Sequence, residues 1–218
     1  MLISPSLIFV HQPRTGGTSV RKLLMELFPY KYLPVSDPLL KREQIVWMMH
    51  QGLVTAHQYA INNNLHPETI PTLVFIRNPY SYMLSEYMYL SQKWGHKIKD
   101  LPKDFEGYLK NMNDKVNSKT RDKWLQSHYG RLQDYLCING VIPKNLTIGR
   151  FETIEQDLKN FLSTQFKIDT SKISLGHENA SEHEGIKKYY SEKEEQLVYN
   201  LWGNVFESGL YSRYQGLE

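Results

Sequence analysis

The segment with the clearest chemistry is HQPRTGGTS, which occupies positions 11–19. Glycines at 16 and 17 let backbone N–H groups approach an anion closely, and the hydroxyls at 18 and 19 add further donors. Arg14 contributes a permanent cation whose forked donor set suits phosphate or sulfate oxygens. These residue types in this order predict a loop that binds a phosphate or sulfate group.

The residues on both sides of this segment predict the elements that position it. The apolar run Leu7–Val10 comes directly before it and indicates a buried strand. Apolar residues after it recur at helical spacing and indicate an amphipathic helix: Val20, Leu23, Leu24, Leu27 and Phe28. The unpaired N–H groups and the positive dipole end of that helix would face the anion. A Walker A loop is excluded, because GxxxxGK[ST] requires lysine at the position of Gly17.

A second candidate anion site follows another apolar run, Thr72–Ile76. Arg77 comes directly after the run, and Asn78 with Pro79 forms a typical start for a helix. Ser85 lies two helical turns after Asn78, so its hydroxyl can share a helix face with the Arg77 side chain. Arginine and serine together predict a second phosphate site at the carboxyl end of a strand, where open α/β sheets bind ligands.

The wider pattern predicts an α/β fold with a central, mostly parallel sheet flanked by helices. Four apolar runs are interpreted as strands: Leu7–Val10, Leu53–Ala56, Thr72–Ile76 and Leu146–Phe151. Further helices are expected from Asp37-Pro38 toward His50, from a capping box at Thr153 and Gln156, and from another at Ser191 and Glu194. We expect one domain over 1–218, with a charged helical insertion around 97–123.

Composition excludes several classes of protein. The chain has 218 residues, and 26 Lys and Arg against 23 Asp and Glu give a net charge of only +3, so no dedicated nucleic-acid binder is expected. Cys137 is the single cysteine, which rules out an internal disulfide. The apolar runs fall far short of the ~20 residues of a membrane span, and no signal peptide precedes them. We therefore expect a cytoplasmic protein without a membrane span.

The two anion motifs resemble those of the sulfotransferases that use 3′-phosphoadenosine 5′-phosphosulfate. PRTGGTS at 13–19 is similar to their 5′-phosphosulfate loop, usually PKTGGTS, and Arg77-Asn78-Pro79 with Ser85 is similar to their 3′-phosphate motif. Gly149-Arg150-Phe151-Glu152 and the closing segment 206–211 look like the carbohydrate branch, which includes the heparan sulfate 2-O-sulfotransferases. The resemblance implies a P-loop-like three-layer fold.

This resemblance runs from about Ile8 to Tyr211 and implies a role for individual residues. Relatives also contact the donor with a basic residue before the final helix, and Lys188 is the nearest match. The family usually has lysine in place of Arg14, and arginine keeps the charge but releases a proton less readily. The implied 5′-phosphosulfate ligands are Arg14 and the amides of Thr15, Gly16, Gly17, Thr18 and Ser19, and the implied 3′-phosphate ligands are Arg77 and Ser85.

Sulfuryl transfer to a hydroxyl needs a general base near the acceptor. His57 follows the predicted strand Leu53–Ala56, which would place it at the sheet edge where the donor is expected. The resembling carbohydrate enzymes have a Gly-His element with a catalytic histidine there, although Ala56 replaces the glycine. We predict His57 as the base, with Glu86 as the alternative, because some relatives with peptide acceptors use a carboxylate. This mechanism requires no metal.

The favoured reaction is transfer of a sulfuryl group from this donor to a hydroxyl acceptor, and a glycan or glycoconjugate is the favoured class of acceptor. Four aromatic residues could stack on a sugar: Trp94, Trp124, Tyr129 and Tyr135. Two alternatives stay open. An ATP-dependent small-molecule kinase is disfavoured by the missing Walker A pattern, and a non-catalytic module would bind the nucleotide or a sulfated glycan without turnover.

Overall fold

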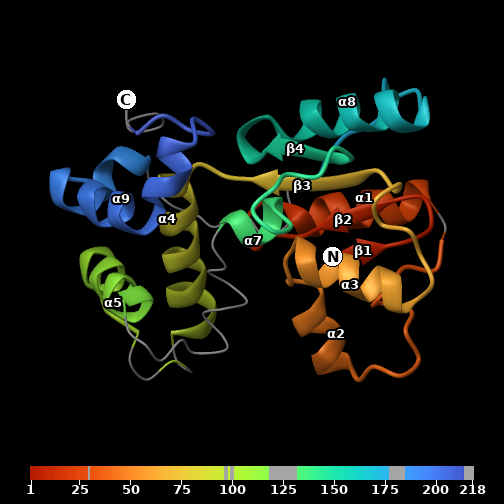
Figure 1. Cartoon of the computed structure of the whole chain (residues 1–218). Helices are drawn as coiled ribbons and strands as arrows, with labels where there is room; N and C mark the ends of the chain where they lie inside the picture. The colour runs from red at the N-terminus through yellow and green to blue at the C-terminus, as the bar shows by residue number, and fades with distance from the viewer. Residues whose placement is uncertain (29, 96–97, 99–100, 118–131, 177–184, 214–218) are drawn as a thin grey trace. The chain divides into compact units, whose positions relative to one another are not determined.

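The structure is a computed structural model that describes residues 1–28, 30–95, 98, 101–117, 132–176 and 185–213 (Figure 1). The chain divides into two compact units, which are described separately. The sheet unit comprises 1–76 with 123–178, and the helical unit comprises 77–122 with 179–218. The division into two compact units does not test the expectation of one domain over 1–218, which stays a prediction.

The sheet unit contains four strands in the order β1-β2-β3-β4 (Figure 1). They are β1 (Leu2–Ile3), β2 (Ile8–Val10), β3 (Thr72–Ile76) and β4 (Leu146–Arg150). β2, β3 and β4 are parallel, and β1 pairs with β2 in the antiparallel sense. All five residues of β3 are buried, as expected for a parallel strand covered on both faces. The predicted α/β fold with a mostly parallel sheet is confirmed.

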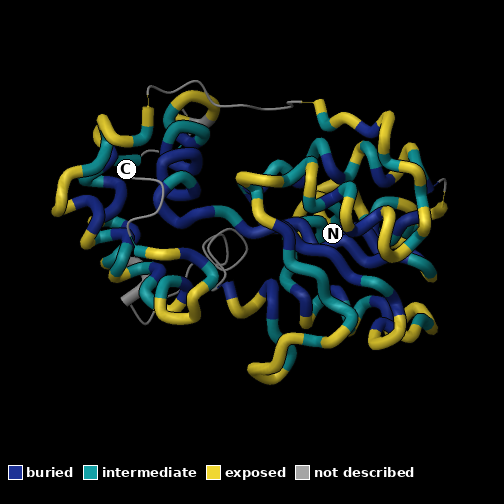
Figure 2. The backbone as a smooth tube through the Cα atoms, turned by 90° about the horizontal axis from the view of Figure 1, so that it is seen from above, coloured by how far each residue is buried: buried dark blue, intermediate teal, exposed yellow. Residues whose placement is uncertain are grey.

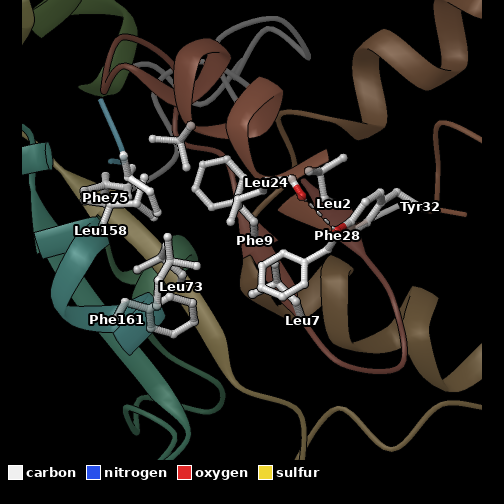
Figure 3. Packing of buried hydrophobic residues seen from close by; sticks show 13 residues of the cluster. Leu2, Leu7, Phe9, Leu24, Phe28, Tyr32, Leu73, Phe75, Leu158 and Phe161 are labelled. Carbon is white, nitrogen blue, oxygen red and sulfur yellow. Dashed lines mark hydrogen bonds between the residues drawn. The ribbon is translucent and has the colours of Figure 1, made fainter. Parts of the chain in front are cut away.

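The core of the sheet unit forms between its strands and its helices. The helices are α1 (Gly17–Leu27), α2 (Arg42–Met48), α3 (Leu53–Asn62), α7 (Leu132–Leu136) and α8 (Ile154–Phe166), with the 3₁₀ turn η2 (Phe151–Thr153) between β4 and α8. Phe9 and Phe75 from the strands pack with Leu24 of α1 and with Leu158 and Phe161 of α8 (Figure 3). Because side chains alternate across a strand, the opposite sheet face is left for α3 and α7, which contact β2 and β3.

One predicted strand is wrong. Leu53–Ala56 forms the first turn of α3 rather than a strand. Leu53, Ala56 and Ala60 are all fully buried, and their spacing of three and four residues is that of one helix face. A short apolar run does not distinguish a buried strand from a buried helix, and here the period continues beyond the run.

One predicted helix start and one predicted helix cap also differ in the structure. α2 begins at Arg42, not at Asp37-Pro38, because the Asp37 carboxylate accepts from the Leu39 amide at 2.9 Å and closes a turn instead. α8 begins at Ile154 as expected, but the Thr153 hydroxyl donates to the Asp157 carboxylate at 2.8 Å and does not cap the helix.

The helical unit is built around α4 (Pro79–Tyr89), which is buried over most of its length (Figure 2). It continues into one π-helical turn, η1 (Leu90–Trp94), and packs with α5 (Phe105–Asn117), the 3₁₀ turn η3 (Ile186–Tyr189) and α9 (Glu192–Glu207). The predicted caps at Asn78 and at Ser191 with Glu194 are confirmed.

The charged stretch 97–123 contains α5, and part of it lies outside the described residues. One face of α5 is buried against the unit through Phe105, Tyr108, Leu109 and Met112. This stretch therefore contributes to the packing of the helical unit and is not only a solvated insertion. Within the described chain, every helix is too short or too polar to cross a membrane.

Candidate functional site

The predicted anion loop connects β2 to α1 and has an unusual backbone. Arg14 and Gly16 both adopt left-handed conformations, with φ of 61° and 71°. Thr15 between them is buried, and its hydroxyl donates to the Gln12 carbonyl at 2.8 Å. Alternation between left-handed and ordinary residues curls successive N–H groups toward one point, which makes an anion-binding concavity. A left-handed arginine costs about 1 to 3 kcal/mol, and such strain is concentrated at functional sites.

The two glycines of the loop are required by close contacts. A Cβ at Gly17 would lie 2.0 Å from Cδ2 of His11, and one at Gly16 would lie 2.7 Å from Cδ1 of Ile154. The His11 ring cannot easily move away, because it is buried, stacks on Phe9 and lies 4.6 Å from the His50 ring, centroid to centroid. Only glycine allows the loop backbone to lie this close to the His11 ring and to the Ile154 side chain.

The start of α1 completes the loop. The amides of Gly17 and Thr18 belong to the first helical turn, where no carbonyl of the same helix lies one turn earlier to accept from them. The Ser19 amide donates to the Gly16 carbonyl at 3.1 Å and so closes this turn. The predicted loop residues 14–19 are therefore brought together at the positive end of an 11-residue helix.

His57, the predicted base, lies in the second turn of α3. Its expected place at the end of a strand is wrong, although α3 does pack against β2, the strand that leads into the anion loop. The side chain is half-buried, and its Nε2 is enclosed without a hydrogen-bond partner. Burial lowers the pKa of His57 below its usual 6.5, opposed by the charge of Glu68. His57 is therefore neutral at pH 7, as a general base must be.

The other histidines differ in their surroundings. The His11 ring packs against Gly17 of the predicted anion loop, and the His50 ring lies against the His11 ring. The side chain of His66 is 83% exposed. The four remaining histidines, at 96, 128, 177 and 183, lie outside the described residues.

His11 gives a test of the loop's packing through stability. Burial, with the charges of His50, the chain's amino group and Arg21, holds the pKa of His11 well below its usual 6.5. The unfolded chain therefore binds a proton below pH 6.5 that the folded chain does not, and the free energy of unfolding should fall as the pH drops through that range, by up to about 1.4 kcal/mol per pH unit. Urea unfolding at pH 7.5, 6.5 and 5.5 measures the slope. His11→Asn should flatten it, exposed His66→Asn should not, and equal slopes in all three proteins would contradict the prediction.

The second predicted anion motif lies in the helical unit. Arg77 follows β3 directly in the chain, and its Nε donates to the Ser81 hydroxyl at 2.9 Å. Ser81 in turn donates to the Asn78 carbonyl at 3.1 Å. Ser85 lies one turn further along α4 and is 1% exposed. Ser81 was not predicted, although its spacing of four residues from Arg77 is the spacing at which helical side chains meet.

Lys188 lies on η3, which packs against α4. Next to η3, the Tyr190 hydroxyl donates to the Tyr80 carbonyl at 2.7 Å, which ties η3 to the first turn of α4. Burial raises the pKa of Tyr190, and the positive charge of Arg77 acts in the opposite direction, so Arg77 lies near this contact. The structure therefore brings the segment of Lys188 to α4, the helix that carries Ser85 and begins two residues after Arg77, with the Lys188 side chain exposed.

The remaining candidates are the alternative base and the aromatic residues that could stack on a sugar. Glu86, the alternative base, is 1% exposed within α4. Tyr135 is buried, and its hydroxyl donates to the His50 carbonyl at 3.1 Å, so its ring offers no face to a sugar. Trp124 and Tyr129 lie outside the described residues, as does the side chain of Trp94.

Comparisons with models of protein families, with curated proteins and with solved structures found no significant match to this chain. Among the described residues, no group of three or more His, Cys, Asp or Glu side chains is placed to hold a metal ion.

Proposed function

We propose that this chain is a sulfotransferase that moves a sulfuryl group from 3′-phosphoadenosine 5′-phosphosulfate to a hydroxyl group, with a carbohydrate as the acceptor. The observation that carries the proposal is the loop between β2 and α1, in which two glycines without space for a Cβ and a left-handed Arg14 precede a helix N-terminus. Such a loop suits a phosphate or phosphosulfate group and lacks the lysine that ATP chemistry on a Walker A loop requires.

When bound, the donor supplies a sulfuryl group whose bond to the bridging oxygen breaks as the bond to the acceptor oxygen forms, leaving adenosine 3′,5′-bisphosphate. Arg14 and the amides of 15–19 bind the 5′ group, and Arg14 stabilises the charge that develops on the departing oxygen. Arg77 and Ser85 bind the 3′-phosphate, and Lys188 adds a cation from η3.

His57 takes the proton from the acceptor hydroxyl in this proposal. Its pKa, which burial lowers, supports the role, because a base needs a neutral imidazole with a lone pair at the pH of the reaction. The chemistry moves one proton and one sulfuryl group, and neither transfer requires a metal.

Calorimetric titration with adenosine 3′,5′-bisphosphate, beside ATP with magnesium, tests the proposal. We expect selective binding of the bisphosphate. Arg77→Ala should weaken it by about 10- to 100-fold, the scale of a hydrogen bond to a charged group, and should leave adenosine 5′-phosphate binding nearly unchanged. A preference for ATP would favour the kinase alternative, and equal losses for both adenosine ligands would refute the 3′-phosphate assignment.

A further inference from the structure

Arg21 carries a positive charge that its described neighbours do not neutralise. It lies in α1, four residues after Gly17 and three after Thr18, the spacing at which side chains share a helix face. Its Nη1 donates to the Sδ of Met49 at 2.7 Å, and a thioether is only a weak acceptor. Among the described residues no carboxylate forms an ion pair with Arg21, although the residue is partly buried. Such a guanidinium suits an anion that comes from outside the protein.

The contacts of Met49 bring this guanidinium to the anion loop. Met49 is followed by His50, whose ring lies 4.6 Å from the His11 ring, centroid to centroid. The His11 ring in turn packs against Gly17, at the start of α1. Burial lowers the pKa of His11 most, and the charges of His50, the chain's amino group and Arg21 lower it further, so Arg21 is close enough to act on this ring. The Arg21 side chain also extends back over the first turn of α1, as long side chains on helices do.

We infer that Arg21 binds the sulfuryl group of the donor, as a second cation beside Arg14. The inference rests on the proposed function, because it assigns a ligand to one half of the phosphosulfate that this function supplies. A phosphosulfate carries one negative charge on its phosphoryl half and one on its sulfuryl half, and a single arginine balances only one of them. A guanidinium has five N–H donors, of which the bond to Met49 uses one, and its planar fork suits the oxygens of a sulfate group.

Removal of the guanidinium should act on the sulfuryl group alone. We expect Arg21→Gln to weaken binding of 3′-phosphoadenosine 5′-phosphosulfate by about 10- to 100-fold, the scale of a hydrogen bond between charged groups. Adenosine 3′,5′-bisphosphate is the same nucleotide without the sulfuryl group, and its affinity should fall by no more than about twofold, the scale of a screened charge effect. The 5′ groups of both ligands carry close to two negative charges at neutral pH, so a general loss of attraction would weaken both alike.

Two further variants separate a contact from a change in net charge. Arg21→Lys keeps the charge without the fork, and it should lose less donor affinity than Arg21→Gln. Lys22→Gln is the matched control, because it removes the same charge from the next position, which is exposed and faces away from Arg21 on the helix. It should leave the ratio of the two affinities unchanged.

Titration calorimetry of these proteins with the donor and with the bisphosphate, in the absence of acceptor, decides the inference, and thermal unfolding shows that each variant is folded. A loss in Arg21→Gln that is confined to the donor, and that Lys22→Gln does not reproduce, supports it. If wild type binds the bisphosphate selectively over ATP but Arg21→Gln weakens both nucleotides equally, or neither, the sulfuryl contact is overturned and the proposed function stands. If wild type binds neither nucleotide, the proposed function fails and this inference fails with it.

Discussion

Replacing His57 with alanine is expected to slow sulfuryl transfer by about 10²- to 10⁴-fold, the usual contribution of a general base. Affinity for adenosine 3′,5′-bisphosphate should stay within about twofold, because an imidazole that acts on the acceptor is not a ligand of the nucleotide. The measurement is single-turnover transfer from labelled donor to a hydroxyl acceptor, with titration of the bisphosphate on the same samples. His66→Ala is the control, since the His66 side chain is 83% exposed.

The pH dependence of the same reaction adds a second test of His57. Burial lowers its pKa from the usual 6.5, so the neutral base persists to lower pH than an exposed histidine would allow. The transfer rate should fall on the acid side with a midpoint below 6.5, and this limb should disappear in His57→Ala. An unchanged rate in the variant, or an acid limb that survives the substitution, would remove His57 from the role.

The loop at 11–19 could be predicted from sequence because most of the residues that shape it are close together in the chain, although Gly16 is also limited by Ile154. The apolar run Leu7–Val10, two adjacent glycines and a helix with clear apolar spacing lie within about twenty residues of each other. The physical reason for Gly17 was not visible in sequence, however, because it depends on the buried ring of His11, six residues earlier. The preceding two-residue strand β1 also gave no pattern, being too short to show alternation.

The surroundings of His57 could not be predicted in the same way. Its strand assignment rested on a run of four residues, whereas the helix is established by Ala60, which continues the buried face, and by Gly52. A Cβ at Gly52 would lie 2.3 Å from the Asp134 carbonyl of α7, a contact between positions 82 residues apart that no local pattern reports. The assignment of His57 as the base therefore stays a prediction, and the lowered pKa of the side chain supports it where the predicted position does not.

The division of the chain between Ile76 and Arg77 was likewise hidden. No Gly- or Pro-rich linker marks it, because the chain passes directly from a fully buried strand into a capped helix. The same continuity explains why Arg77-Asn78-Pro79 was readable as the start of a helix while Ser81 was missed. Asn78 and Pro79 are terminal signals with their own preferences, whereas a serine within a helix has no such signal until its partner is known.

Substitution of Gly17 by alanine should nearly abolish nucleotide binding, with a loss of about 100-fold or more, and should lower the free energy of unfolding by about 1 to 3 kcal/mol, the usual cost of overpacking a buried site. The added methyl would overlap Cδ2 and Nε2 of His11, at 2.0 and 2.2 Å. Relief requires the backbone of the loop to move, and the amides of the first turn of α1 move with it. Calorimetric titration and urea unfolding measure the two effects.

The contact itself can be tested by removing its other half. In a His11→Ala background the overlapping ring atoms are gone, so Gly17→Ala should cost at least about 1 kcal/mol less than it does in wild type, within the range of coupling between residues in contact. Gly203→Ala in α9 is the matched glycine control, because its nearest neighbours would lie 3.8 Å from the new Cβ. It should leave stability unchanged or slightly raised, since alanine is the better helix former. If Gly17→Ala lowers the free energy of unfolding equally with and without the His11 ring, the contact between positions 11 and 17 does not restrict the loop. The close approach of the loop backbone to His11 would then no longer support anion binding.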